Sequence, residues 1–183
     1  MTDIFISADN IFSPLGANTA ENFSQLKNNV SGIKLHDDLI MSGQPFYASL
    51  FDSTKAFAAE ANQNDYTKFE KLLITSIKNA LDNSKINTRS KKTVLIISST
   101  KGNISLLETE TCSKALQARI SLNTSAKLVA EHFGFTNKPV VVSNACISGL
   151  LAILTGMRLI RSGQYENAVV AGADVISKFV LSG

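Results

Sequence analysis

The 183-residue chain contains few cysteines and no long apolar run. Its two cysteines, Cys112 and Cys146, are too few to form a disulfide framework in a chain this rich in apolar residues. No apolar stretch approaches the ~20 residues that a membrane span requires, and the N-terminus lacks the basic and apolar regions of a signal peptide. We therefore expect a reduced, cytoplasmic protein without a membrane span.

Charged residues and motifs that bind metals or nucleotides are also scarce. Charged residues make up 18% of the chain and the formal net charge is +3, which is too small to indicate a nucleic-acid-binding protein. It leaves room only for a local basic patch that contacts an acidic partner. No residues have the spacing of metal ligands, and neither a phosphate-binding loop nor a dinucleotide fingerprint occurs. We expect neither a metal nor a bound cofactor.

Apolar residues make up 44% of the chain, which is enough for the core of one ordinary domain. Continuous β-branched runs are typical of strands that are covered on both faces of a sheet. Such runs occur at 94–97, 139–142 and 168–173. Residues 4–8 are a candidate fourth strand, and 46–50 a candidate arm of a hairpin.

Four segments between these runs have helical spacing. Thr19 is a candidate cap for a short helix with the apolar face Phe23, Leu26 and Val30. Asp65 is a candidate cap for a longer helix that extends to residue 81. Helical stretches follow at 116–133, and the segment 147–161 is apolar nearly all round, which predicts a buried helix. The alternation of strands and helices predicts a layered α/β fold with a partly parallel sheet.

The most informative residue is Cys146, which lies between the predicted strand 139–142 and the buried helix. The N–H groups and the positive dipole end at a helix start stabilise a thiolate, and they also hydrogen-bond a developing oxyanion. Gly149 has no side chain, so another element or an acyl chain can approach closely. A free cysteine is often only a small buried hydrophobe. The residues alone leave both interpretations open.

The segment 143–150, Ser-Asn-Ala-Cys-Ile-Ser-Gly-Leu, resembles the nucleophile motif of β-ketoacyl-acyl carrier protein synthases. The segments at 11–33, 128–134 and 160–174 are similar to the family's opening strand, loop and helix, and to the elements before and after the motif. The resemblance covers nearly the whole chain. It implies a thiolase-like α/β fold with a mixed, mostly parallel sheet of about five strands flanked by helices, of which residues 1–183 would be the N-terminal half.

The resemblance also implies a mechanism and partners. Cys146 matches the nucleophile, which accepts an acyl group from an acyl carrier protein and donates its backbone N–H to the oxyanion hole. A malonyl-carrier thioester then condenses with the acyl group, in fatty-acid, polyketide or aryl-polyene synthesis. The substrates are phosphopantetheine thioesters, and no other cofactor is implied. Residues 140–142 match the strand that pairs across the family's dimer interface, so a homodimer or a ketosynthase-like heterodimer is expected.

The acyl pocket is expected to include Lys101, Gly102, Ala145 and Gly149. Many family members have a glycine-rich turn where this chain has Ser98-Ser-Thr-Lys-Gly-Asn103. Lys101 is either an ordinary surface lysine in that turn or a sign that the pocket accepts an unusual acyl chain.

The chain departs from the family in its histidines. The family's cysteine works with two histidines from a second half, but this chain has only His36 and His132, and neither matches a catalytic position. We therefore expect a fragment of a longer protein, inactive in condensation by itself. Two alternatives remain: a non-catalytic partner subunit that shapes an acyl tunnel, which generally lacks the cysteine, and a coenzyme A thiolase, in which the nucleophile comes earlier in the chain.

Overall fold

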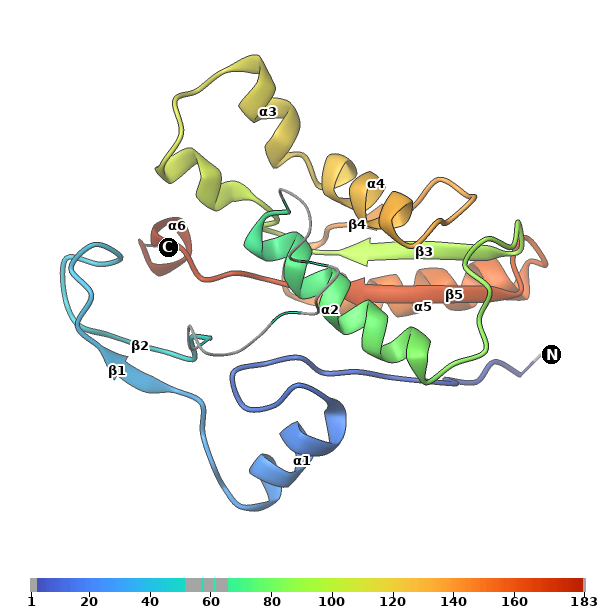
Figure 1. Cartoon of the computed structure of the whole chain (residues 1–183), viewed down its shortest axis with the longest axis horizontal. Helices are drawn as coiled ribbons and strands as arrows, with labels where there is room; N and C mark the ends of the chain where they lie inside the picture. Colours follow the sequence, from blue (N-terminus) through green and yellow to red (C-terminus); the bar gives the residue numbers. More distant parts are fainter. Residues whose placement is uncertain (1–2, 52–56, 58–60, 62–65, 183) are drawn as a thin grey trace.

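The computed structural model describes residues 3–51, 57, 61 and 66–182. Its centre is a parallel sheet of three strands in the order β4-β3-β5 (Figure 1). The strands are β3 (Thr93–Ser98), β4 (Val140–Val142) and β5 (Asn167–Gly172). All three were predicted from their β-branched runs, and the parallel pairing confirms the predicted α/β class.

The central strand β3 is buried along its whole length. Leu95 and Ile97 face one apolar cluster and Val94 and Ile96 face another, as the alternation of side chains along a strand requires. These four residues have no exposed surface. The sheet therefore has a core on each side.

Helices cover both faces of the sheet. Helices α2 (Lys68–Asp82) and α4 (Leu122–His132) pack on one face, and α5 (Ser148–Arg161) packs on the other (Figure 1). Close packing of α5 depends on Gly156, where a Cβ atom would lie 3.2 Å from the Cβ of Ala168. α5 also contacts β4, the strand that precedes it in the chain.

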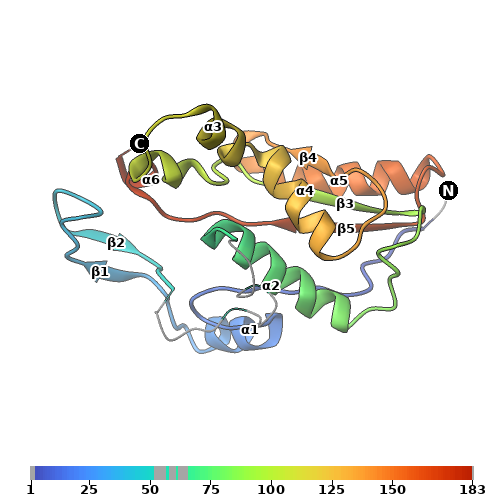
Figure 2. The ribbon, with the colours of Figure 1, turned by 45° about the horizontal axis from the view of Figure 1, so that its top comes forward.

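A smaller unit precedes the layered part. It contains α1 (Thr19–Lys27) and the antiparallel strands β1 (Lys34–His36) and β2 (Phe46–Ala48), which project beyond the layers (Figure 2). The predicted hairpin arm at 46–50 is thus confirmed as β2, whereas β1 was not predicted. The described strands number five, but they form two sheets and not the single mixed sheet expected.

Several predicted details are wrong. Asn18, and not Thr19, caps α1 by accepting the N–H of Glu21. The predicted apolar face is uncovered, since Phe23 and Leu26 are exposed, and Val30, also exposed, lies beyond the end of α1. Residues 4–8 form no strand, because this segment pairs with no neighbour among the described residues and leaves Phe5 and Ile6 more than four-fifths exposed.

The helix caps follow local chemistry. Thr67 and Glu70 form a reciprocal capping box at the start of α2, and the predicted cap Asp65 lies outside the described residues. The helical stretch predicted at 116–133 is two helices, α3 (Lys114–Ile120) and α4, which meet at the extended residue Ser121. The remaining short elements are the 3-10 helices η2 (Ile104–Glu108) and η3 (Ala145–Ile147) and the helix α6 (Lys178–Ser182).

Helix α5 differs from its prediction in one respect. Its apolar residues on one side pack on the sheet, but Leu150 is 61% exposed and Ile153 is 53% exposed. The helix is therefore half covered and not buried all round.

Candidate functional site

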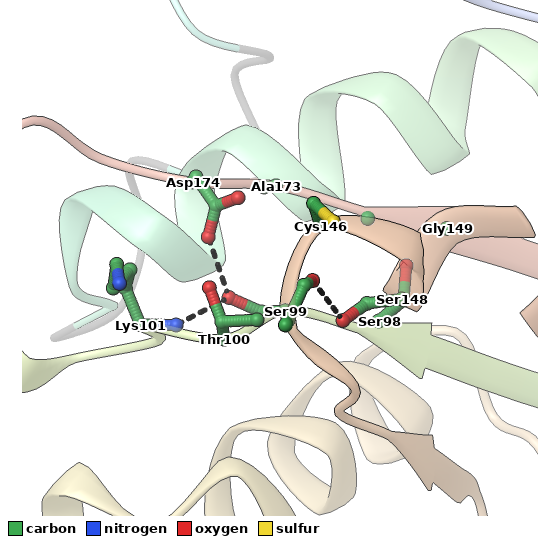
Figure 3. A pocket seen from close by; sticks show the side chains of 11 residues that line it. Ser98, Ser99, Thr100, Lys101, Cys146, Ser148, Gly149, Ala173 and Asp174 are labelled. Carbon is green, nitrogen blue, oxygen red and sulfur yellow. Dashed lines mark hydrogen bonds between the residues drawn. The ribbon is translucent and has the colours of Figure 1, made fainter. Parts of the chain in front are cut away.

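The carboxyl ends of the three parallel strands meet at one edge of the sheet. An open pocket of about 630 Å³ lies there, formed by the turn after β3, the turn between β4 and α5, and the segment after β5 (Figure 3). Ligand sites of open α/β sheets occur at this edge. The lining residues are Ser98, Ser99, Thr100, Lys101, Ala145, Cys146, Ser148, Gly149, Gly172, Ala173 and Asp174.

Cys146 occupies the middle of η3, a 3-10 turn whose last residue, Ile147, directly precedes α5. It is exposed and forms no disulfide. The hydroxyl of Ser148 fixes this turn, because its Oγ accepts the N–H of Asn144 at 2.8 Å and donates to the carbonyl of Ala145 at 2.8 Å. The sulfur-bearing residue is therefore held at a helix start and faces a pocket, which is not the environment of a core residue.

Ala145 has φ +44°, in the left-handed region that alanine rarely adopts. This conformation costs roughly 1–2 kcal/mol in a non-glycine residue. It turns the chain sharply between β4 and α5, immediately before Cys146. Strain of this kind is found preferentially at functional sites.

The opposite wall is the turn formed by residues 99–103. Ser99 is buried, and its hydroxyl donates to Oδ1 of Asp174 at 2.9 Å (Figure 3). The Oγ of Ser99 also accepts the N–H groups of Lys101 at 3.2 Å and Gly102 at 3.0 Å. One serine thus ties the end of β3 to the segment after β5.

The structure brings together four of the five residues that the sequence assigned to the site: Lys101, Ala145, Cys146 and Gly149. Gly102 is buried next to this pocket and has φ +51°, and a Cβ atom there would lie 2.5 Å from Cδ2 of Leu122. The ammonium group of Lys101 lies 5.7 Å from the ring centroid of Phe179 in α6.

The sequence pointed to the turn 98–103 and to the motif around Cys146, but it gave no individual role to the polar lining residues Ser98, Ser99, Thr100, Ser148 and Asp174. Their position in the sequence could have indicated a site, because most of these residues directly follow predicted strands. Strand order, which the sequence does not give, decides that the ends of β3 and β5 are neighbours.

An ion pair between the buried Glu70 and the partly exposed Arg119 is hydrogen-bonded to the turn 99–103 through Asn103. Glu70 has no exposed surface, and both its carboxylate oxygens accept hydrogen bonds from the Arg119 guanidinium, at 2.5 Å for the Nη2–Oε2 pair. Ser125 Oγ and the N–H of Thr67 also donate to this carboxylate, at 2.7 and 3.0 Å. Burial raises the pKa of Glu70, but the bonds from Arg119, Thr67 and Ser125 outweigh it and lower the pKa overall.

Both histidines have local contacts outside the pocket lining. His36 lies in β1, where Nε2 is 3.1 Å from the carbonyl of Ala48. His132 ends α4, with Nδ1 3.2 Å from the hydroxyl of Tyr66. Cys112 is exposed and lies outside the pocket lining.

Metal ligands and membrane-spanning helices are both absent from the part of the chain that the structure describes. No cluster of three or more His, Cys, Asp or Glu side chains there is placed to hold a metal ion. No helix in the same residues combines the length and apolar character needed to cross a bilayer.

A parallel sheet is covered by helices on both faces, and a cysteine lies at the turn into the helix on one of them, which is the arrangement expected from the resemblance. Residues 1–180 match the family model described as "Beta-ketoacyl synthase, N-terminal domain". The chain belongs to this family, which confirms the resemblance. A search of curated proteins found no match.

Solved structures agree with this fold. The chain is similar to "The ishigamide ketosynthase/chain length factor", with 17% identity and a TM-score of 0.74 over 94% of this chain and 53% of that one. It is also similar to a ketosynthase in complex with its chain length factor from Xenorhabdus doucetiae, with 19% identity and a TM-score of 0.75 over 96% and 48% of the two chains.

A β-ketoacyl synthase from Burkholderia phymatum is similar at 16% identity, with a TM-score of 0.67 over 87% and 44% of the chains. The chain thus spans about half the length of the structures that it matches.

Proposed function

We propose that the chain is the nucleophile-bearing part of a β-ketoacyl-acyl carrier protein synthase, and that Cys146 accepts the acyl group. The observation that carries this proposal is the position of Cys146. It is exposed, lies in the turn η3 just before α5, and lines a pocket at the carboxyl edge of the sheet. Membership of the family supports it. The substrates would be phosphopantetheine thioesters on an acyl carrier protein.

In the proposed reaction the thiolate of Cys146 attacks the carbonyl carbon of an acyl-carrier thioester. The carbonyl oxygen becomes an oxyanion, which N–H groups at the start of α5 stabilise. The carrier thiolate then leaves and takes up a proton, so that the acyl group is transferred to the enzyme. Covalent catalysis divides the difficult condensation into two steps.

In the second step a malonyl-carrier thioester loses CO₂ and supplies a carbanion. The carbanion attacks the Cys146 thioester, forms the new carbon–carbon bond and expels the Cys146 thiolate. The product is a β-ketoacyl thioester on the carrier. This condensation is proposed for the whole protein, because the chain spans about half of the ketosynthase chains it resembles.

The proposed partners are an acyl carrier protein and a second ketosynthase-like chain. Among the described residues β4 is an edge strand, and the neighbouring α5 exposes Leu150 and Ile153. This side therefore offers strand hydrogen-bond groups and apolar surface to a second chain. The non-catalytic partner subunit is the second candidate function. Two of the similar structures contain a ketosynthase together with a chain length factor, and the exposed Cys146 argues for the catalytic member of such a pair.

Acyl transfer can be tested directly by mass spectrometry after incubation with an acyl-carrier thioester. The proposal predicts a mass increase equal to the acyl group on the peptide that contains Cys146. It also predicts no increase in a Cys146→Ala variant and full labelling in a Cys112→Ser control. Labelling of Cys112 alone, or of neither cysteine, would reject the acyl-accepting role.

A further inference from the structure

The turn 99–103 is held at both ends, and only one of these attachments belongs to the pocket. At the pocket end, Ser99 bonds to Asp174. At the far end, Asn103 is 2% exposed and lies outside the pocket lining. The bonds of Asn103 therefore fix the turn from inside the protein.

Asn103 connects the turn to the buried ion pair. Its Nδ2 donates to Oε1 of Glu70 at 3.3 Å and to Oγ of Ser125 at 3.0 Å, and its Oδ1 accepts the hydroxyl of Thr67 at 2.7 Å. The same Nδ2 lies 3.3 Å from the carbonyl of Arg119. These partners come from the start of α2, from α3 and from α4. Three helices therefore hold Asn103 in place.

The carboxylate of Glu70 organises this cluster. It accepts hydrogen bonds from four residues, Thr67, Asn103, Arg119 and Ser125, and no neutral side chain of the same size offers two such oxygens. Buried networks of this kind are rigid when every member is satisfied. Loss of the charge would release Arg119 and loosen the cluster.

We propose that Glu70 is a positioning residue for the pocket: acting through Asn103, it fixes the turn 99–103 that forms the wall opposite Cys146. The inference rests on the proposed acyl-accepting function. The side chain of Glu70 has no place in the pocket lining, so its effect is on the fit of the acyl chain and not on the chemistry of the thiol.

The test compares three reagents on the cysteine of the full chain. Iodoacetamide needs only an accessible thiol, acetyl-N-acetylcysteamine carries a short acyl group, and octanoyl-N-acetylcysteamine carries a long one. Glu70→Gln is expected to lower the octanoyl transfer rate at Cys146 roughly tenfold relative to the acetyl rate, since small displacements of positioning groups have effects of this order. The iodoacetamide rate should stay within about twofold of the wild-type value.

Two further variants separate positioning from stability. Asn103→Ala leaves the ion pair in place but cuts its link to the turn, so it should reproduce the loss of octanoyl transfer. Ile77→Val is the matched control. Ile77 is buried in the same helix as Glu70, but it belongs to the apolar core and not to the hydrogen-bonded cluster around Glu70. It lowers stability by about 0.5–1.5 kcal/mol, and its octanoyl-to-acetyl ratio should equal that of the wild type.

The outcomes are distinguishable. Equal ratios in the wild type, Glu70→Gln and Asn103→Ala would overturn the positioning role while leaving the proposed function intact. A wild-type chain that reacts with iodoacetamide at Cys146 but with neither thioester would overturn the proposed function, and the inference with it.

Discussion

The Ser99 hydroxyl donates a hydrogen bond of 2.9 Å to Oδ1 of Asp174 and accepts two backbone N–H groups of its own turn. This one oxygen joins the end of β3 to the segment after β5, and both lie in the pocket wall. The shape of the pocket therefore depends on a contact between residues 75 positions apart.

The first prediction concerns this contact. Ser99→Ala should lower the free energy of unfolding by about 1–3 kcal/mol, because buried N–H groups lose their acceptor. Asp174→Asn is the control, since its amide oxygen still accepts the serine hydroxyl, and its effect should stay below about 0.5 kcal/mol. Urea denaturation measures both values. A stable Ser99→Ala variant with an unchanged midpoint would argue against the bond's importance.

The second prediction concerns acid stability. The pKa of Glu70 is lowered in the folded protein from the ordinary value of 4.5. Its charged form therefore stabilises the fold above pH 4.5, and this contribution is lost as the pH falls below 4.5 through the folded-state pKa. Urea denaturation at several pH values between neutrality and acid should show a smaller loss of stability in Glu70→Gln than in the wild type. Parallel curves for the two proteins would contradict the lowered pKa.

Arg119→Met is the complementary variant for the same ion pair. It leaves the buried carboxylate of Glu70 without its cation, and such changes cost about 3–5 kcal/mol. The double variant Glu70→Gln/Arg119→Met should recover part of this loss, because no unpaired charge remains. A double variant that is less stable than both single variants would show that the pair does not act as a unit.

The third prediction uses two glycines in helix α5. A Cβ atom at Gly156 would lie 3.2–3.4 Å from side-chain atoms of Ala168, Ile96 and Val170, whereas a Cβ atom at Gly149 would meet nothing within 4 Å. Gly156→Leu should therefore destabilise the protein by about 1–3 kcal/mol through overpacking. Gly149→Ala should leave stability unchanged or slightly raised. Thermal denaturation of the two variants checks the difference, and equal midpoints would be incompatible with the close packing of α5.

The strands and the cysteine turn could be predicted from the sequence because their signals are local. Val94 to Ile97 form a continuous apolar run, which is typical of a strand covered on both faces. The Cys146 turn joins such a run directly to a long apolar helix. Neither prediction required knowledge of distant contacts.

The remaining features depend on contacts that no local pattern encodes. Asn18 and Thr19 are both good caps, so composition could not choose between them. The exposure of Leu150 depends on what covers α5, which its hydropathy cannot reveal. Glu70 and Arg119 are 49 positions apart, and their pairing follows only from the packing of α2 and α3 against α4.

The central claim is that Cys146, which lies in the 3-10 turn just before α5, is the reactive nucleophile of the pocket. Cys112 is an internal control, because both cysteines are free and exposed. At near-neutral pH, iodoacetamide should alkylate Cys146 at least roughly fivefold faster than Cys112, since a cysteine placed at a helix start is expected to be more reactive than an equally accessible surface cysteine. Peptide mass spectrometry over time measures both rates, and equal, slow labelling of the two cysteines would contradict the claim.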